Sequence, residues 1–167
     1  AFRVALRGLK GGHSGVDIHL QRGNAIRLLA RILDAGASGT AFRLATFEGG
    51  DKHNAIPREA TAVVLVGETD VDGFRDRLEA ELERVQDAFA PVEPGLSMTA
   101  DEAAAPAQAM DAESSWRALH LLHGLPHGVA AMSYDIPDLV ETSTNLARVR
   151  TEGDRMTVLM STRSSVA

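Results

Sequence analysis

The pattern of apolar and polar positions predicts strands and helices along most of the chain. Residues 2–7 alternate between apolar and polar side chains, which predicts a half-buried strand. Residues 22–33 carry apolar side chains three and four positions apart, which predicts a helix, and we expect Asp34-Ala35-Gly36 to end it. The same criteria predict strands at residues 41–47, 61–66, 96–99, 139–149 and 155–162, and helices at residues 69–89 and 111–122.

The order of these elements indicates the fold class. The elements follow one another as strand, helix, strand, strand, helix, strand, helix, strand, strand. This order packs most simply as an α+β two-layer sandwich, in which a mostly antiparallel sheet carries two main helices on one face. This arrangement is ferredoxin-like. The 167 residues, of which 44% are apolar, are enough for one hydrophobic core. We therefore expect a single domain over residues 1–167, within which an inserted α/β elaboration occupies about residues 95–138.

Composition and charge exclude several classes of protein. The formal net charge of −6 argues against a nucleic-acid partner, since binding phosphates requires a surplus of Lys and Arg. No apolar run approaches the roughly 20 residues of a membrane span, so we expect no membrane partner. The lack of cysteine excludes disulfides and thiol chemistry and is compatible with the cytoplasm, where we expect the protein. The chain opens on a strand without Met and stops abruptly at Ala167, so we expect it to be part of a longer chain.

A histidine between glycines is the most prominent candidate for chemistry. His13 lies in the run GGHSG (residues 11–15), where small neighbours let the backbone approach a ligand and leave the imidazole prominent. The alternative is that the glycines only form a turn and His13 is simply exposed. His13, Asp17 and His19 could also bind a metal ion, but no further cluster of ligands supports them, so we expect no metal site in this chain.

Three further polar residues occupy positions that a functional site could use. Asn54 precedes an Ile-Pro turn, where Asn forms turns more often than it binds ligands. Asn145 lies inside a predicted strand, from which Asn is usually depleted, and this suggests a polar role. Arg163 ends the last apolar run, where its guanidinium could bind a carboxylate or could be solvated at a strand end. The histidines that we expect on the surface are His120, His123 and His127.

Three segments carry a resemblance to a known family. They are GLKGGHSGVDIH (residues 8–19), NAIPREA (residues 54–60) and VETSTNL (residues 140–146). In this order and spacing, the chain resembles the aminoacyl-histidine dipeptidases (Xaa-His dipeptidases), which are relatives of the carnosinases among the co-catalytic zinc peptidases. The likeness covers essentially the whole chain.

The resemblance implies that the chain is the lid and dimerisation domain of a zinc-dependent metallopeptidase, a hydrolase that cleaves dipeptides. In that family a separate catalytic domain binds two zinc ions through a His-x-Asp motif, a Glu-Glu pair and further ligands, and neither motif occurs in this chain. We therefore expect no cofactor here, two Zn in the catalytic domain of the parent enzyme, no activity from the isolated domain, and a homodimer formed through it.

The resemblance also implies roles for individual residues. His13 would have a catalytic role: it would reach an active site, which we expect to be that of the other subunit, and hydrogen-bond the oxygen of the tetrahedral intermediate. Arg163 would bind the C-terminal carboxylate of the dipeptide. Asn54 and Asn145 would make polar contacts to the substrate.

Two other functions are compatible with the same residues. The first is a free-standing ferredoxin-like regulatory module that binds an amino acid between subunits. The second is a purely structural oligomerisation domain, in which His13 and Arg163 would face bulk solvent.

Overall fold

Four strands form the centre of one antiparallel sheet. In the computed structural model, which describes residues 1–166, they lie side by side in the order β6 (Ser97–Glu102), β1 (Phe2–Arg7), β5 (Ala60–Val66) and β3 (Phe42–Gly49). Each neighbouring pair is antiparallel. The apolar residues that alternate in β1, Phe2, Val4 and Leu6, are buried as their spacing predicted. The strand order and the helices between the strands are those of a ferredoxin-like sandwich.

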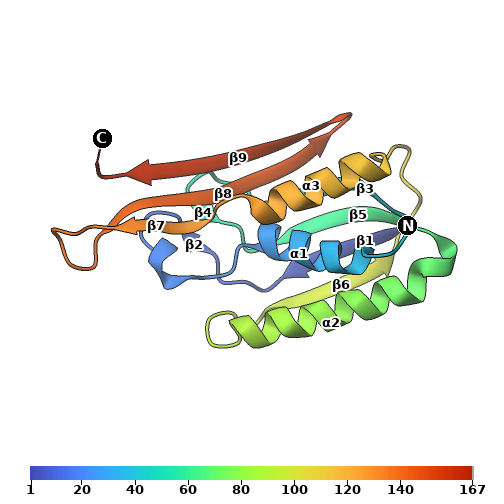
Figure 1. Ribbon diagram of the computed structural model, residues 1–167, viewed down its shortest axis with the longest axis horizontal. Coiled ribbons are helices and arrows are strands. Elements are labelled where there is room, and N and C mark those ends of the chain that lie inside the picture. The colour runs from blue at the N-terminus through green and yellow to red at the C-terminus, as the bar shows by residue number, and fades with distance from the viewer. Residues whose placement is uncertain (167) are drawn as a thin grey trace.

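Three helices cover one face of this sheet (Figure 1). They are α1 (Ala25–Ala37), α2 (Val71–Phe89) and α3 (Ala112–Gly124), and α1 packs against both of the others. The apolar faces of the helices and the inward side chains of the sheet form one core, whose largest buried members include Phe42, Phe47 and Phe74. The prediction of an α+β two-layer fold is confirmed, with a third helix in the helical layer. Among residues 1–166, no helix has both the length and the apolar character needed to cross a membrane.

A long hairpin extends the sheet beyond its central strands. β8 (Val140–Glu152) joins β3 where Gly49 pairs with Val149, and β9 (Arg155–Ser164) pairs with β8 along most of its length. The hairpin turn falls at the predicted position and contains Gly153 with a φ of 60°. β6 pairs with β1 and so belongs to the central sheet.

β7 (Gly128–Met132) is a strand that the sequence pattern did not predict. It pairs with residues 140–144 of β8 with two irregularities in register, and its burial pattern does not alternate. A short strand with irregular pairing leaves no period-two signal in the sequence. For this reason the pattern indicated no element between residues 123 and 138.

α1 continues through the residues that were expected to end it. The helix ends at Ala37, with Ser38 as its C-cap. Gly36 lies where α1 contacts α2, and a Cβ at this position would lie 2.7 Å from Leu78 Cδ2 and 3.1 Å from Phe74 Cε2. The expectation that Gly36 ends the helix is wrong, because this glycine permits a close approach of two helices and does not form a turn.

A small two-stranded ribbon lies outside the main sheet. It consists of β2 (Gly12–His13) and β4 (Ala55–Ile56), and β4 contacts β8 (Figure 1). The sequence predicted only turns in these segments. Short 3₁₀ helices η1 (Ile18–Leu20) and η2 (Glu68–Asp70) follow the ribbon strand β2 and the strand β5, respectively.

Candidate functional site

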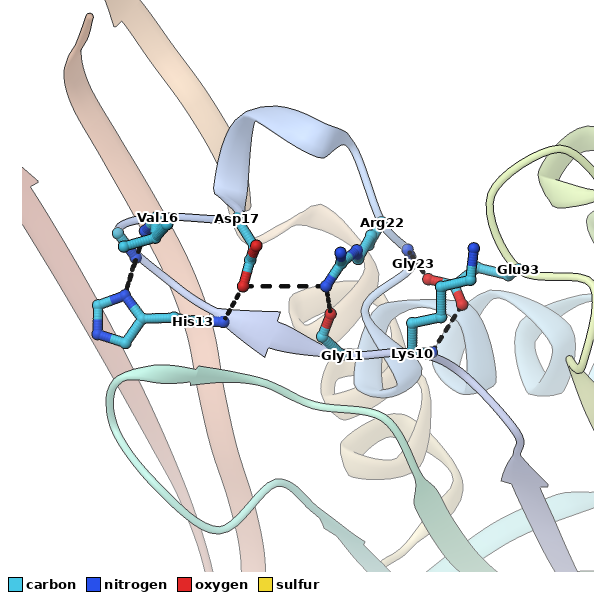
Figure 2. Close-up of polar contacts among 9 residues, drawn as sticks. Lys10, Gly11, His13, Val16, Asp17, Arg22, Gly23 and Glu93 are labelled. Atoms are coloured by element: carbon cyan, nitrogen blue, oxygen red, sulfur yellow. Dashed lines mark hydrogen bonds and ion pairs between the residues drawn. The ribbon is translucent and has the colours of Figure 1, made fainter.

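The imidazole of His13 is held by its own turn. The backbone N–H groups of Gly15 and Val16 both donate to His13 Nδ1, each at 3.1 Å. Figure 2 shows His13 beside Val16 in this turn. Because Nδ1 accepts these two hydrogen bonds, the neutral imidazole carries its proton on Nε2. The turn therefore presents an Nε2–H donor on a half-buried side chain.

Asp17 and Arg22 brace the same turn (Figure 2). The backbone N–H of His13 donates to Asp17 Oδ2 at 2.8 Å, and Arg22 Nη1 lies 3.9 Å from that oxygen. Arg22 Nη1 also donates to the carbonyl of Gly11 at 2.7 Å. The Asp17 carboxylate is thus engaged with the backbone of the turn. Across residues 1–166, no group of three or more His, Cys, Asp or Glu side chains is placed to hold a metal ion.

Glu93 ties together the two ends of the segment that carries His13. The residue is only 2% exposed, and its carboxylate accepts hydrogen bonds from the N–H groups of Lys10 at 2.8 Å and Gly23 at 2.9 Å (Figure 2). No local pattern marks Glu93 in the sequence, since its partners lie 83 and 70 positions earlier. The segment between Lys10 and Gly23 is therefore anchored to the chain that follows α2.

Asn54 lies next to His13 across the small ribbon. Ala55 of β4 pairs with His13 of β2, and the N–H of Ser14 donates to the Asn54 carbonyl at 2.8 Å. The side chain of Asn54 is half-buried. Backbone pairing thus brings together two predicted site residues that are distant in the sequence.

Arg163 reaches the same turn from near the end of the chain. It is exposed on β9, opposite Ser143 of β8. The point at which Gly15 would carry a Cβ lies 2.9 Å from Arg163 Nη1 and 3.2 Å from His13 Cε1. The guanidinium and the imidazole therefore lie close together over Gly15, and a side chain at that position would displace one of them. The structure thus brings His13, Asn54 and Arg163 close together and defines one candidate site.

Asn145 lies beneath this site and is 1% exposed. Its Nδ2 donates to the carbonyls of His53 at 3.3 Å and Ala55 at 2.9 Å. Within the described residues, its Oδ1 accepts no hydrogen bond. A contact between Asn145 and a substrate stays a prediction, and the partners observed for this side chain are backbone carbonyls.

A broad groove of about 920 Å³ lies beside the candidate residues. Gly12 and Ala55 line one part of it, while Arg3 and Arg7, from the helix-free face of β1, line another. Cations and carboxylates are mixed along its walls, and His13, Asn54 and Arg163 are not among its lining residues. The three predicted site residues thus lie next to this groove and outside its walls.

His127 is partly buried beside the start of α1. Its Nδ1 lies 3.2 Å from Asn24 Nδ2, which donates to it. Burial and, to a lesser extent, the Arg27 guanidinium lower the pKa of His127 from 6.5 to about 4. The expectation of a surface position holds for His120 and His123, which are exposed. It is wrong for His127, because the imidazole lies against Asn24, the N-cap of α1.

Comparison with known proteins decides the family. Residues 4–90 match the family model described as "Peptidase dimerisation domain". The chain belongs to this family. The match runs from β1 to the end of α2, so it covers the central part of the fold and includes His13 and Asn54.

Two relatives extend the likeness to most of this peptidase dimerisation domain. The "Cytosol non-specific dipeptidase" of Escherichia coli (strain K12) is 38% identical over 148 residues, which are 89% of this chain and 30% of that protein. The crystal structure of the aminoacylhistidine dipeptidase from Vibrio alginolyticus matches with a TM-score of 0.92 and 36% identity, over 98% of this chain and 33% of that chain. The domain thus spans about one third of the length of these relatives, and the predicted resemblance to aminoacyl-histidine dipeptidases is confirmed.

Proposed function

We propose that this domain is the lid and dimerisation domain of a zinc-dependent dipeptidase of the Xaa-His type, and that it supplies His13, Arg163 and Asn54 to the active site. The observation that carries the proposal is the close approach of the Arg163 guanidinium to the His13 imidazole over Gly15, together with the two backbone bonds to Nδ1 that leave Nε2–H as the donor. A donor beside a cation suits a dipeptide, whose carbonyl oxygen and C-terminal carboxylate lie close together. The names of the two related dipeptidases support the same reaction class.

His13 would act on the transition state. When water adds to the scissile carbonyl, negative charge develops on the carbonyl oxygen, and a fixed N–H donor stabilises this charge more than it stabilises the ground state. The His13 ring is already oriented by Gly15 and Val16, so its Nε2–H needs little reorganisation to donate. One such donor contributes about 3–4 kcal/mol to stabilisation of the transition state.

Arg163 and Asn54 would bind the substrate before it reacts. The guanidinium of Arg163 is exposed and can donate two parallel hydrogen bonds to a carboxylate. The half-buried side chain of Asn54 carries an amide that can donate to or accept from the peptide. Both contacts are equally available to the ground state and to the transition state.

The two zinc ions that the family resemblance implies would be bound by a catalytic domain outside this chain. The side chains of residues 1–166 do not fit a metal pair, because no group of three ligands is present and Asp17 and His13 Nδ1 are engaged by backbone N–H groups. The domain would therefore be inactive in isolation. The family description supports a homodimer formed through this domain, and the name of the relative from Escherichia coli supports a cytoplasmic location.

A free-standing module that binds an amino acid is the second candidate function. Such a module would use Arg163 to bind the carboxylate but would not need the Nε2–H donor of His13. Calorimetry that showed tight binding of free amino acids to the isolated chain would favour it over the lid of a peptidase.

The test of the first proposal is His13→Ala in the full-length enzyme. We expect kcat to fall roughly 100- to 1000-fold with little change in KM, because the hydrogen bond strengthens mainly in the transition state. Arg163→Ala should instead raise KM with a smaller effect on kcat, since the carboxylate is bound in both states. Steady-state kinetics on a dipeptide measure both quantities.

Two exposed residues provide matched controls. His19 lies in the same segment as His13, and Arg155 lies at the opposite end of β9 from Arg163. His19→Ala and Arg155→Ala should leave kcat and KM near the wild-type values. An unchanged kcat in His13→Ala would refute the proposed catalytic role.

A further inference from the structure

Asn145 holds the carbonyl groups of the two residues on either side of Asn54. It lies in the middle of β8, and its single NH₂ group donates to the carbonyls of His53 and Ala55 at 3.3 Å and 2.9 Å. A primary amide has two N–H donors and can serve two carbonyls at once. Its position in the interior, 1% exposed, leaves essentially no surface for a direct contact with a substrate.

The segment that Asn145 holds is the support of the His13 turn. Ala55 pairs with His13 in the β2–β4 ribbon, and the carbonyl of Asn54 accepts the N–H of Ser14 at 2.8 Å. A displacement of residues 53–55 would therefore move the Asn54 side chain and the backbone that carries the imidazole together.

The same strand fixes the third site residue. Two positions before Asn145, Ser143 of β8 pairs with Arg163 of β9. β8 thus contacts the ribbon through the Asn145 side chain and holds Arg163 through backbone pairing. The spacing between the guanidinium and the imidazole over Gly15 depends on both connections.

We propose that Asn145 is a positioning residue for the active site: it makes no contact with the substrate and instead fixes the His13–Asn54 ribbon in register with Arg163. This inference rests on the proposed function of His13. It replaces the substrate contact that the family resemblance implied for Asn145, because the amide donors are already used by the ribbon.

The chain offers a closely matched control for Asn145. Thr151 lies in the same strand, and its Oγ1 accepts from the N–H of Phe47 at 2.9 Å and donates to the carbonyl of Phe47 at 3.2 Å. Thr151→Val therefore removes two hydrogen bonds from β8 to a neighbouring backbone, away from the ribbon. Asn145→Leu also removes two hydrogen bonds while keeping a side chain that branches at Cγ. Asn145→Asp keeps the shape and size but places an oxygen against the two carbonyls.

The first measurement is steady-state kinetics of the full-length enzyme. We expect Asn145→Leu and Asn145→Asp to lower kcat by about tenfold or more, since a small misplacement of a catalytic group has a large effect on rate. Thr151→Val should change kcat by less than about twofold, although it should lower Tm by about as much as the Asn145 variants do. Equal effects of the Asn145 and Thr151 variants on kcat would overturn the proposal in favour of a purely structural role.

A double mutant separates positioning from direct contact. If Asn145 acts through His13, Asn145→Leu should lower kcat much less in the His13→Ala background than in the wild type. An undiminished effect in that background would mean that Asn145 does not act through His13, and the proposal would be wrong.

Amide hydrogen exchange tests the positioning without reference to catalysis. We expect the N–H groups of Ser14 and Ala55 to exchange at least about tenfold faster in Asn145→Leu than in Thr151→Val, because the ribbon loses its anchor. Unchanged exchange would overturn the proposal even if kcat falls. A different outcome is faster exchange in Asn145→Leu together with a normal kcat in His13→Ala. That outcome would support the anchoring of the ribbon by Asn145 and refute the proposed function of His13.

Discussion

The role proposed for His13 depends on which ring nitrogen carries the proton. Two backbone donors, from Gly15 and Val16, occupy Nδ1 and leave Nε2 as the donor. These donors come from the residues directly after the histidine, so the tautomer is set within the GGHSG run itself. The absence of a side chain at Gly15 then allows Arg163 to approach the ring. The short glycine-rich turn therefore holds the imidazole in a fixed orientation.

His127 shows how burial affects the protonation of a histidine, because burial destabilises the charged imidazolium form. Burial and the Arg27 guanidinium lower the pKa of His127 to about 4, from 6.5 in the unfolded chain. Between these values the unfolded chain binds a proton that the folded chain does not. The contribution of His127 to the free energy of unfolding is therefore complete above about pH 6.5 and decreases as the pH falls toward 4.

We predict that His127→Gln will weaken the pH dependence of stability between pH 6.5 and pH 4. Urea unfolding of the chain at several pH values in this range measures the effect, and the wild type should lose more stability on acidification than the variant. His19→Gln serves as the control, since His19 is exposed. The prediction fails if His127→Gln and the wild type lose stability in parallel.

At the scale of elements, the glycines within two of the helices differ in the packing around them. Gly36 of α1 faces α2, where an added methyl group would lie 2.7 Å from Leu78 and 3.1 Å from Phe74, both buried. Gly73 of α2 has the guanidinium of Arg77 as its nearest neighbour, at 3.1 Å. The first glycine is required by packing, whereas the second has only the end of a flexible side chain beside it.

We predict opposite signs for alanine at these two positions. Gly36→Ala should lower the free energy of unfolding by about 1–2 kcal/mol, because overpacking outweighs the gain in helix propensity. Gly73→Ala should leave it unchanged or raise it by up to about 1 kcal/mol. Chemical denaturation of the two variants provides the comparison, and stabilisation by Gly36→Ala would contradict the tight contact between α1 and α2.

At the scale of the whole molecule, the candidate site is assembled from three distant parts of the chain. β2 contributes His13, the segment before β4 contributes Asn54, and β9 contributes Arg163. These residues lie beside the groove and outside its walls, which is the arrangement expected of groups that complete a site on another domain. If that site belongs to the other subunit, the proposed homodimer is part of the catalytic unit.

We predict that mixed dimers will recover activity. Subunits of the full-length enzyme carrying His13→Ala, when combined with subunits inactivated at a metal ligand of the catalytic domain, should form one intact site of two, provided that His13 acts across the dimer. Dipeptide hydrolysis by isolated heterodimers measures the recovery. Each homodimeric variant is the control, and heterodimers without activity would show that His13 acts within its own subunit.

The sequence indicated much of the fold because periodicity is a local property. The strand β1, the long helices α1 and α2 and the β8–β9 hairpin could all be predicted from apolar spacing and turn residues. β7 could not, since irregular pairing leaves no period. The prediction that Gly36 ends α1 was also wrong, because the neighbouring sequence of a glycine at a helix crossing can be the same as that of a glycine at a helix end.

For the candidate site, the sequence by itself predicted which residues could carry chemistry: a glycine-flanked His13, and the polar residues Asn54 and Arg163. Only the tertiary structure decided that they lie close together. Their meeting over Gly15, the anchoring of the turn by Glu93 and the engagement of Asn145 with the ribbon all join residues that are far apart in the chain. Such contacts have no local signature, because they depend on strand register and burial, which are established only when the whole sheet and its helices pack.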